Sequence, residues 1–504
     1  MNLNSIIIMA ITILSKIAGL AREKVLASLY GTSPTAESFI TAFAIPMFMI
    51  TLTTVAVATG FIPMYDKIKS LKGEDSAQLY TANLINVSFV IGICFTILGI
   101  VFSTPLVRLF ASGFKGQTLQ MAVSFTRWGM LSMSITGVAS VIRSQLQIHN
   151  KFGASVSQGL VMNIFIIVAL LFSKKFGNIY LGVGIFLAMS LQYIIYIPSF
   201  IKTGYKHRRT LDFRDNLLKE FIILMIPIIL AVSVNELNVI INRSIASTIV
   251  EGGVAAINYG FRLQSFVTGI VVTSIVTAIY PSLSKSAASE DFVGMEKRII
   301  SASITMGILV IPATVGLIVF AQPIVHLLFF GGAFDENAVI ITKDVMAYYS
   351  LGMFALGVRE IAVRVCYSIQ DTKTPVINAV IMVLTNIVLN YILSKFLGIK
   401  GLALATTIAT AVGAVLLLLS IQKKMVQIQW GKTVRDGIKI LIASLAIGVA
   451  SRAVYYSLLD KLQSNKALLF AILIAVAVYG AMLLLLRVEE LSSLVNKDRI
   501  MNRI

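Results

Sequence analysis

Residues 15–24, SKIAGLAREK, place four charged side chains in the later part of an otherwise apolar first helix. A charge that faces hydrocarbon costs about 2.5 kcal/mol or more at the bilayer centre, so charges inside a span usually face a bundle interior or a water-filled cavity. Lys16 and Glu23 are seven residues apart and share a helix face, whereas Arg22 lies about 100° round from Glu23. The charges therefore line one broad side of the helix, which indicates a polar cavity. The alternative is that Arg22–Lys24 form a collar at the membrane interface.

The composition indicates an all-α polytopic membrane protein. Of 504 residues, 57% are hydrophobic and 13% are charged, and so few charges could not cover a water-exposed surface. The net charge of +19 would suit nucleic acid, but the basic residues lie in short loops between apolar spans, where the positive-inside rule puts them. We therefore expect no nucleic-acid partner. Cys94 and Cys366 both fall within apolar spans, which favours neither a disulfide framework nor a metal site.

The chain contains fourteen apolar segments long enough to cross about 30 Å of hydrocarbon. We expect spans at 5–30, 36–64, 79–103, 121–148, 155–173, 179–201, 221–249, 259–283, 299–322, 340–367, 376–394, 400–421, 437–457 and 467–486. The connections after even-numbered spans hold most of the loop lysines and arginines. This bias predicts that these connections and both termini lie in the cytoplasm.

An internal repeat recurs at a spacing of about 220 residues. Pro105–Phe110 matches Pro323–Leu328, and each is followed by a short turn, Gly113-Phe114 or Gly332-Ala333-Phe334. Six spans separate equivalent positions, so the two halves should have the same orientation and be related by an axis along the membrane normal, as in transporters. The predicted domains are an N-terminal lobe 1–201, a basic connector 202–220, a C-terminal lobe 221–421, and two further helices with a cytoplasmic tail, 422–504.

Cations dominate the polar side chains that we expect at the seam between the lobes. An arginine offers a planar fork that fits phosphate oxygens, so an excess of cations favours an anionic substrate. For Arg262 the alternative is an anchor at the membrane interface. The candidates are Lys16, Arg22, Glu23 and Glu37 in the first half, and Asn235, Glu236, Asn238, Asn242, Arg243 and Arg262 in the second.

Two pairs of small polar residues repeat at helical spacing in spans 11 and 12. Asn386 and Asn390 share one helix face, as do Thr406 and Thr410. Their oxygens could hold a hard monovalent cation, but hydrogen bonding between the helices is the alternative explanation. A glycine-rich phosphate loop is absent from the sequence and its three histidines are scattered, so we expect a transporter rather than an enzyme.

Several stretches resemble the MurJ/MviN lipid II flippases of the multidrug/oligosaccharidyl-lipid/polysaccharide exporter superfamily. The resemblance implies fourteen helices, two six-helix lobes, alternating access, and a hydrophobic groove for the lipid tail formed by helices 13 and 14. The matching stretches are residues 15–23, Thr35–Phe39, Ala42–Phe43, Ile45–Pro46, Asn258–Leu263, Tyr280–Lys285, Gly332–Phe334 and Tyr367–Pro375.

The resemblance also implies functional residues. Substrate-binding positions of the family fall on Lys16, which replaces an arginine, on Glu37, which replaces an aspartate, and on the retained Arg22 and Arg262. Span 2 departs from the family. Where the family has a pair of arginines and a following Glu-Gly, this chain has the uncharged residues Ile50, Thr51, Val55 and Ala56. The sodium site of some family members maps onto Asn235 or Glu236, Asn386, Asn390 and Thr406.

The resemblance therefore implies a flippase in the bacterial cytoplasmic (inner) membrane. It would carry lipid II, the undecaprenyl-pyrophosphate-linked peptidoglycan precursor, to the outer leaflet, and so serve cell wall biogenesis and cell shape. We expect no cofactor beyond Na⁺ coupling or dependence on the membrane potential. The alternatives are export of another polyprenyl-linked saccharide, which the uncharged span 2 favours, and a drug/cation antiporter, which the cationic cavity disfavours. The sequence leaves the headgroup, the coupling ion and the oligomeric state open.

Overall fold

The computed structural model describes residues 3–424 and 430–486. Within these ranges the chain is helical throughout, and its only strand-like pairing is one bridge between Gly331 and Phe334. Packing separates two compact units. Unit 1 takes the chain up to Ala255 together with the short segment Gly331–Asp335, and unit 2 takes the rest.

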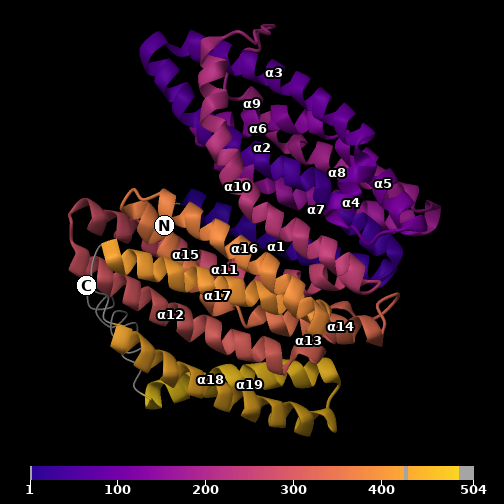
Figure 1. Ribbon diagram of the computed structural model, residues 1–504, viewed down its shortest axis with the longest axis vertical. Helices are drawn as coiled ribbons and strands as arrows, with labels where there is room; N and C mark the ends of the chain where they lie inside the picture. Colours follow the sequence, from indigo (N-terminus) through magenta and orange to yellow (C-terminus); the bar gives the residue numbers. More distant parts are fainter. Residues whose placement is uncertain (1–2, 425–429, 487–504) are drawn as a thin grey trace. The chain divides into compact units, whose positions relative to one another are not determined.

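Unit 1 contains the helices of the first half of the chain and the first long helix of the second half. They are α1 (Leu3–Tyr30), α2 (Pro34–Lys72), α3 (Glu74–Val101), α4 (Ser103–Phe110), α5 (Gly116–Met130), α6 (Met133–Ile148), α7 (Phe152–Phe176), α8 (Ile179–Leu191), the 3₁₀ turn η1 (Gln192–Ile195), α9 (Tyr196–Ile201) and α10 (Asn216–Ile249) (Figure 1).

Unit 2 begins in the first turn of α11 and ends with the two helices outside the repeat. Its helices are α11 (Gly253–Ala288), α12 (Phe292–Val319), α13 (Ala321–Phe329), α14 (Glu336–Ser350), α15 (Met353–Ser368), α16 (Lys373–Leu397), α17 (Ile399–Lys424), α18 (Trp430–Leu459) and α19 (Ser464–Leu485). The last two pack against each other, and α18 also packs on α12 (Figure 1).

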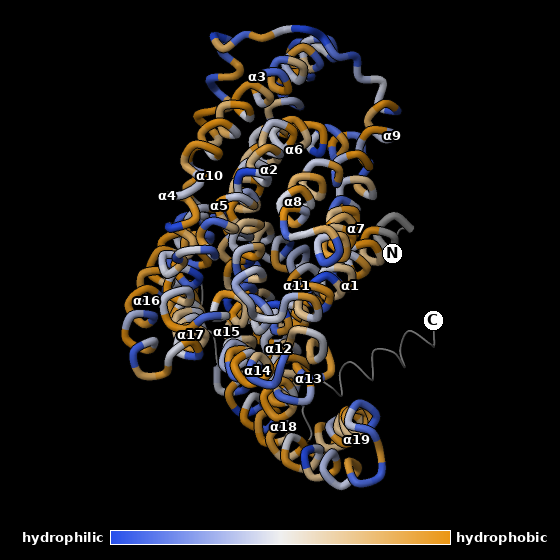
Figure 2. The backbone as a smooth tube through the Cα atoms, turned by 90° about the vertical axis from the view of Figure 1, so that its right-hand side faces the viewer, coloured by the Kyte–Doolittle hydropathy of each residue, from blue (hydrophilic) through white to orange (hydrophobic). Residues whose placement is uncertain are grey.

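Local sequence explains where several helices begin. Ser33 accepts a hydrogen bond from the N–H of Ala36 and is followed by Pro34 at the first helical position of α2, the usual start of a helix. The carboxylates of Asp215 and Asp291 cap α10 and α12 in the same way. Figure 2 shows the result, with hydrophobic residues along the helices and hydrophilic residues collected mainly at the turns.

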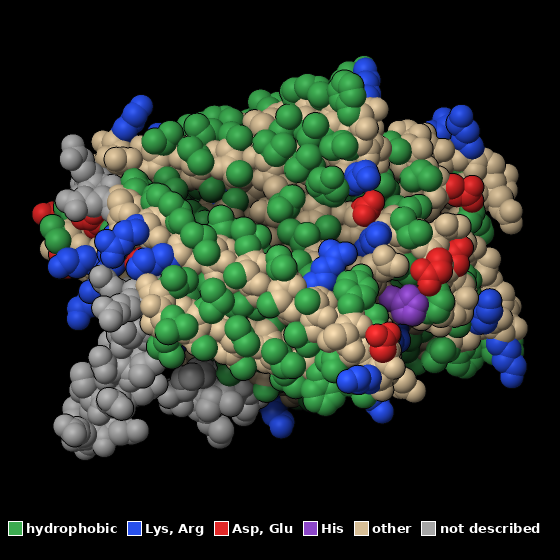
Figure 3. All heavy atoms as spheres, turned by 90° about the horizontal axis from the view of Figure 1, so that it is seen from below, with side chains coloured by type: hydrophobic (Ala, Val, Ile, Leu, Met, Phe, Trp, Pro, Cys, Tyr) green, Lys and Arg blue, Asp and Glu red, His purple; other side chains and the backbone are tan. Residues whose placement is uncertain are grey.

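The helices confirm the expected membrane architecture. All fourteen expected spans coincide with helix over the described residues. Two of them are broken pairs, α5 with α6 and α14 with α15, and the span 179–201 consists of α8, η1 and α9. Eleven helices are long and apolar enough to cross a membrane, or twelve if α14 and α15, bent by 41°, form one span. The two expected spans outside this set are the charged α1 and the α5–α6 pair. Figure 3 shows one face with a wide hydrophobic area, the kind of surface that lipid covers.

The basic connector predicted at 202–220 packs on α3 inside unit 1. The side-chain amide of Asn83 donates to the carbonyl of Asp212 at 2.9 Å, and that of Asn86 donates to the carbonyl of Thr210 at 2.7 Å. These bonds hold the connector in place although it has little regular structure of its own. The repeat-based lobe limits stay a prediction, because packing groups α10 with unit 1 instead. The predicted cytoplasmic tail falls mostly on residues 487–504, outside the described residues.

Candidate substrate-binding residues

The charged stretch of α1 holds a buried ion pair. Arg22 is 7% exposed and Glu23 is 2% exposed, and a guanidinium nitrogen of Arg22 lies 2.5 Å from a carboxylate oxygen of Glu23. Adjacent helical residues point about 100° apart, so burying both requires α1 to be covered over a wide arc. The helices that pack on it are α7 and α2. A buried pair of this kind is costly to desolvate and is therefore weak evidence for stability.

An aromatic ring of α2 completes the surroundings of Arg22. The guanidinium carbon of Arg22 lies 5.2 Å from the centre of the Phe43 ring, within the range of a cation–π contact. Sequence reasoning quoted Phe43 only as part of a family motif and did not connect it with Arg22. The available signal was weak, because the two residues lie on different helices and nothing in their spacing joins them.

Glu37 lies in the first turn of α2 and is 3% exposed. Its carboxylate accepts a hydrogen bond of 2.8 Å from the backbone N–H of Val254, in the first turn of α11. A carboxylate at a helix N-terminus satisfies an otherwise unpaired N–H and interacts favourably with the helix dipole. Glu37 therefore caps α11, a contact between residues 217 positions apart that the sequence did not reveal.

The remaining candidates differ in exposure and in unit. Lys16 on α1 and Glu236 on α10 are both half-buried, and both belong to unit 1. Arg262 is exposed on α11 and belongs to unit 2. The structure thus brings Arg22 and Glu23 together and places Glu37 on the next helix of the same unit. The side chain of Asn235 lies outside the described residues.

The uncharged stretch of α2 is largely an apolar wall. Ile50 and Ala56 are buried, Val55 is 39% exposed, and the hydroxyl of Thr51 donates to the carbonyl of Met47 within the same helix. Nearby, α2, α3, α6 and α10 enclose a cavity of about 420 Å³ with a mainly apolar lining. Where the family has charged residues on this helix, α2 of this chain therefore has a mainly apolar surface.

The proposed sodium ligands of unit 2 form one hydrogen-bonded chain between α16 and α17. The amide of Asn390 donates to the side-chain oxygen of Asn386 at 2.7 Å, and the amide of Asn386 donates to the hydroxyl of Thr406 at 3.1 Å. Both asparagines are fully buried. Side-chain oxygens suit a hard cation, but two of these oxygens already accept hydrogen bonds. The geometry agrees with the alternative explanation, hydrogen bonding between helices.

The carboxylate of Asp371 binds the first turn of α16. It accepts from the N–H of Thr374 at 3.0 Å and lies 2.5 Å from the ammonium of Lys424. Burial acts to raise the pKa of Asp371, but the hydrogen bonds from Lys424 and Thr374 outweigh it and bring the pKa to about 2. Asp371 therefore stays ionised and ties the turn before α16 to the end of α17.

The fold is shared with one class of solved membrane transporters. A multidrug resistance MATE family transporter of the MOP superfamily, in an inward-facing conformation, matches 83% of this chain and 98% of its own with a TM-score of 0.69 and 15% sequence identity. At that identity the likeness concerns the fold alone.

The match to one family within this class is closer. The model of the family "Lipid II flippase MurJ" matches residues 26–477, so the chain belongs to this family of transporters. The lipid II flippase MurJ of Burkholderia cenocepacia is 28% identical over 82% of both chains, and a probable one from Haemophilus influenzae is 27% identical over 95% of this chain and 98% of its own. A MurJ structure in an inward closed conformation covers 98% of this chain and 100% of its own, with a TM-score of 0.83 and 26% identity.

Proposed function

We propose that this chain is a lipid II flippase, which moves the undecaprenyl-pyrophosphate-linked peptidoglycan precursor from the cytoplasmic to the outer leaflet of the bacterial cytoplasmic membrane. The family match and the lipid II flippase relatives, aligned over most of the chain, support it. The structural observation that carries it is Arg22, a cation buried on a membrane helix beside Glu23. A charge in that position calls for a functional explanation.

Arg22 is the proposed ligand of the substrate pyrophosphate. A guanidinium binds phosphate oxygens through two parallel N–H bonds, and such charge-assisted bonds are stronger than neutral ones. Glu23 pairs with Arg22 in the absence of substrate. When substrate binds, its pyrophosphate replaces the carboxylate of Glu23 as the anion that Arg22 contacts. Lys16, on the same helix as Arg22, is proposed to add positive charge for this anion. Arg262 of unit 2 is a further proposed substrate-binding residue. Substrate then drives alternating access because it binds one conformation more tightly than the other.

Growth rescue tests the proposal. The chain is expressed in cells whose only lipid II flippase is depleted, and the parent should restore growth. Arg22→Ala should fail at normal membrane abundance, because losing charge-assisted bonds of about 1.5–3 kcal/mol weakens binding roughly ten- to a hundredfold. Arg22→Lys keeps the charge without the planar fork and should rescue partly.

Lys24→Ala is the matched control, since it removes an exposed cation two residues along the same helix. It should rescue fully. Rescue by Arg22→Ala at the parent level would refute the role of Arg22 in substrate binding.

The orientation of the chain is part of the proposal. Basic residues gather in the connections after even-numbered spans, which supports cytoplasmic termini. Reporter fusions after Lys69, Lys206 and Lys424 should therefore read cytoplasmic, and fusions after Ser33, Gly113 and Asp335 external. One reversed pair would contradict the parallel orientation of the two halves.

Sodium coupling is proposed beside its alternative, dependence on the membrane potential, with Asn386, Asn390 and Thr406 of unit 2 as candidate ligands. Glu236 of unit 1 is a further candidate ligand. The support is the oxygen chemistry of these side chains and the burial of the two asparagines. Replacing Asn390 by Ala should abolish the sodium dependence of transport. Transport by the parent chain that is indifferent to sodium would refute the proposal.

A second candidate substrate is another polyprenyl-linked saccharide. The apolar α2 around Ile50, Thr51 and Val55 favours it, because charges that could read a polar headgroup are missing there. Failure of the parent to restore growth despite normal membrane abundance, together with transport of a different lipid-linked saccharide by purified protein, would select this candidate. A drug/cation antiporter shares only the fold.

A further inference from the structure

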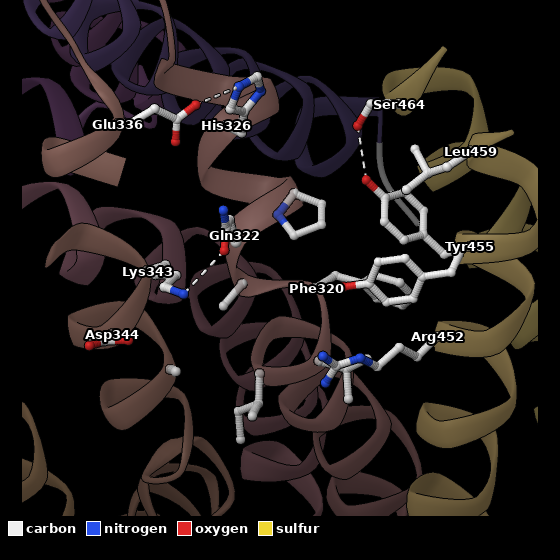
Figure 4. Close-up of a pocket in the computed structure, with 16 residues that line it drawn as sticks. Phe320, Gln322, His326, Glu336, Lys343, Asp344, Arg452, Tyr455, Leu459 and Ser464 are labelled. Carbon is white, nitrogen blue, oxygen red and sulfur yellow. Dashed lines mark hydrogen bonds and ion pairs between the residues drawn. The ribbon is translucent and has the colours of Figure 1, made fainter. Parts of the chain in front are cut away.

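A cavity of unit 2 remains unexplained by the transport of lipid II. It measures about 490 Å³ and lies between the α12–α14 segment and the α18–α19 hairpin. That volume falls in the range of about 300–1,000 Å³ typical of small-molecule sites. Figure 4 shows side chains from both groups of helices around it, with Lys343 on one side and Arg452 on the other. The cavity could therefore hold an anion between two cations.

Two cations and two carboxylates line this cavity, and Lys400, which pairs with Asp344 from outside the lining, adds a third cation. Its two carboxylates already have cationic or basic neighbours, since Glu336 lies 3.4 Å from a ring nitrogen of His326 and Asp344 lies 3.4 Å from the ammonium of Lys400. Lys343 donates to the neutral side chain of Gln322 at 3.1 Å.

Arg452 has an aromatic rather than an acidic neighbour. Its guanidinium carbon is 5.7 Å from the centre of the Tyr456 ring, and no ion pair of Arg452 with an acid occurs among the described residues. Neither Arg452 nor Lys343 is in an ion pair with an acid among the described residues, so both cations can contact an anion in the cavity.

The rest of the lining is apolar and aromatic. Val319 and Leu459 are partly buried, Phe320 is 3% exposed, and Tyr455 packs edge-on against Phe320 with its hydroxyl 2.9 Å from that of Ser464. Tyrosines at the ends of spanning helices mark the level of lipid headgroups. A ligand that suits this lining has an anionic head and an apolar body.

We propose that this cavity binds an anionic phospholipid of the surrounding membrane, with the phosphate between Arg452 and Lys343 and an acyl chain along Val319 and Leu459. In the proposed topology the cavity opens at the outer leaflet, because the turn between α18 and α19 is external. Basic pockets between membrane helices bind anionic headgroups in this way. The bound lipid would join α18 to α13 and α14 as a structural ligand separate from the transported substrate.

Native mass spectrometry of the detergent-solubilised full chain tests this inference. The probes are phosphatidylglycerol, phosphatidylcholine with the same acyl chains, and glycerol 3-phosphate. The chain should retain one phosphatidylglycerol roughly ten-fold more tightly than phosphatidylcholine, and glycerol 3-phosphate should not displace it at equal concentration, because it lacks the acyl chains. Equal binding of both lipids would overturn the inference, and displacement by glycerol 3-phosphate would make the cavity a site for soluble anions.

Variants of the lining residues test whether the preference for phosphatidylglycerol over phosphatidylcholine arises in this cavity. Arg452→Ala and Lys343→Ala should each weaken phosphatidylglycerol binding about ten-fold and leave phosphatidylcholine unchanged, whereas Arg452→Lys should keep the preference. Lys461→Ala is the matched control, since it removes a cation from the turn of the same hairpin outside the lining. An equal loss in Lys461→Ala would show general surface attraction and refute the site. Because transport is not measured, failure of the flippase proposal would leave this test intact.

Discussion

Two turns at corresponding places in the repeat, residues 111–114 and 331–334, are built alike but attached differently. In each, the N–H of the last residue, a buried phenylalanine, donates to the carbonyl of the first at 3.2 Å. Each turn touches the first long helix of the opposite half, near that helix's end. Both contacts lie within unit 1, although the second turn comes from the half of the chain that otherwise forms unit 2.

The difference lies in what the third residue of each turn binds. The N–H of Gly113 donates to the side-chain oxygen of Ser247 on α10 at 2.9 Å, whereas the N–H of Ala333 donates to the backbone carbonyl of Ser28 on α1 at 2.8 Å. The second turn also uses left-handed backbone, with φ of +64° at Gly332. One contact therefore depends on a side chain and the other on backbone shape, so the two should respond to different substitutions.

The largest effect is expected for Gly332→Ala. A Cβ there would lie 2.1 Å from the carbonyl oxygen of Ser28, and the left-handed φ adds strain for any side chain. Strain and loss of the Ala333–Ser28 hydrogen bond should together lower the free energy of unfolding by about 2–4 kcal/mol. Thermal unfolding of the purified protein in detergent measures it. A midpoint equal to that of the parent would show that this turn is not held against α1.

Gly113→Ala should destabilise somewhat less. Its Cβ would lie 2.0 Å from the carbonyl oxygen of Ser247, but the φ of Gly113 is outside the left-handed region. Overpacking and the displaced hydrogen bond are then the only causes of destabilisation, and they typically lower the free energy of unfolding by about 1–3 kcal/mol. The same unfolding assay should place this variant between the parent and Gly332→Ala. The reverse order would mean that backbone strain does not separate the two turns.

The smallest effects come from the serines and distinguish the two attachments directly. Ser247→Ala deletes the acceptor of the Gly113 N–H and should cost about 1 kcal/mol. Ser28→Ala keeps the carbonyl that accepts from Ala333, and because Ser28 is exposed the change should stay within about 0.5 kcal/mol. Equal losses in both variants would contradict the distinction between side-chain and backbone attachment.

The sequence predicted these turns as repeated elements but not their partners. Gly113-Phe114 and Gly332-Ala333-Phe334 stand out because glycine and a following aromatic recur after similar short helices. Which helix end each turn reaches depends on helix lengths and packing, which no local pattern encodes. The same reason applies to Glu37, which was expected among the polar residues of the seam and whose carboxylate accepts a hydrogen bond from the backbone N–H of Val254.

The sequence by itself determined the membrane class, the helical spans and the family, because hydrophobic length, loop charge and motif strings are local properties of the chain. It also predicted that Arg22 and Glu23 belong to a special environment, since charges are rare inside a span. Only the tertiary structure decided that Arg22 pairs with its neighbour under the ring of Phe43, and that Lys343 and Arg452 line one cavity. Those outcomes depend on how helices far apart in the sequence pack, and burial then sets how strongly each charge needs a partner.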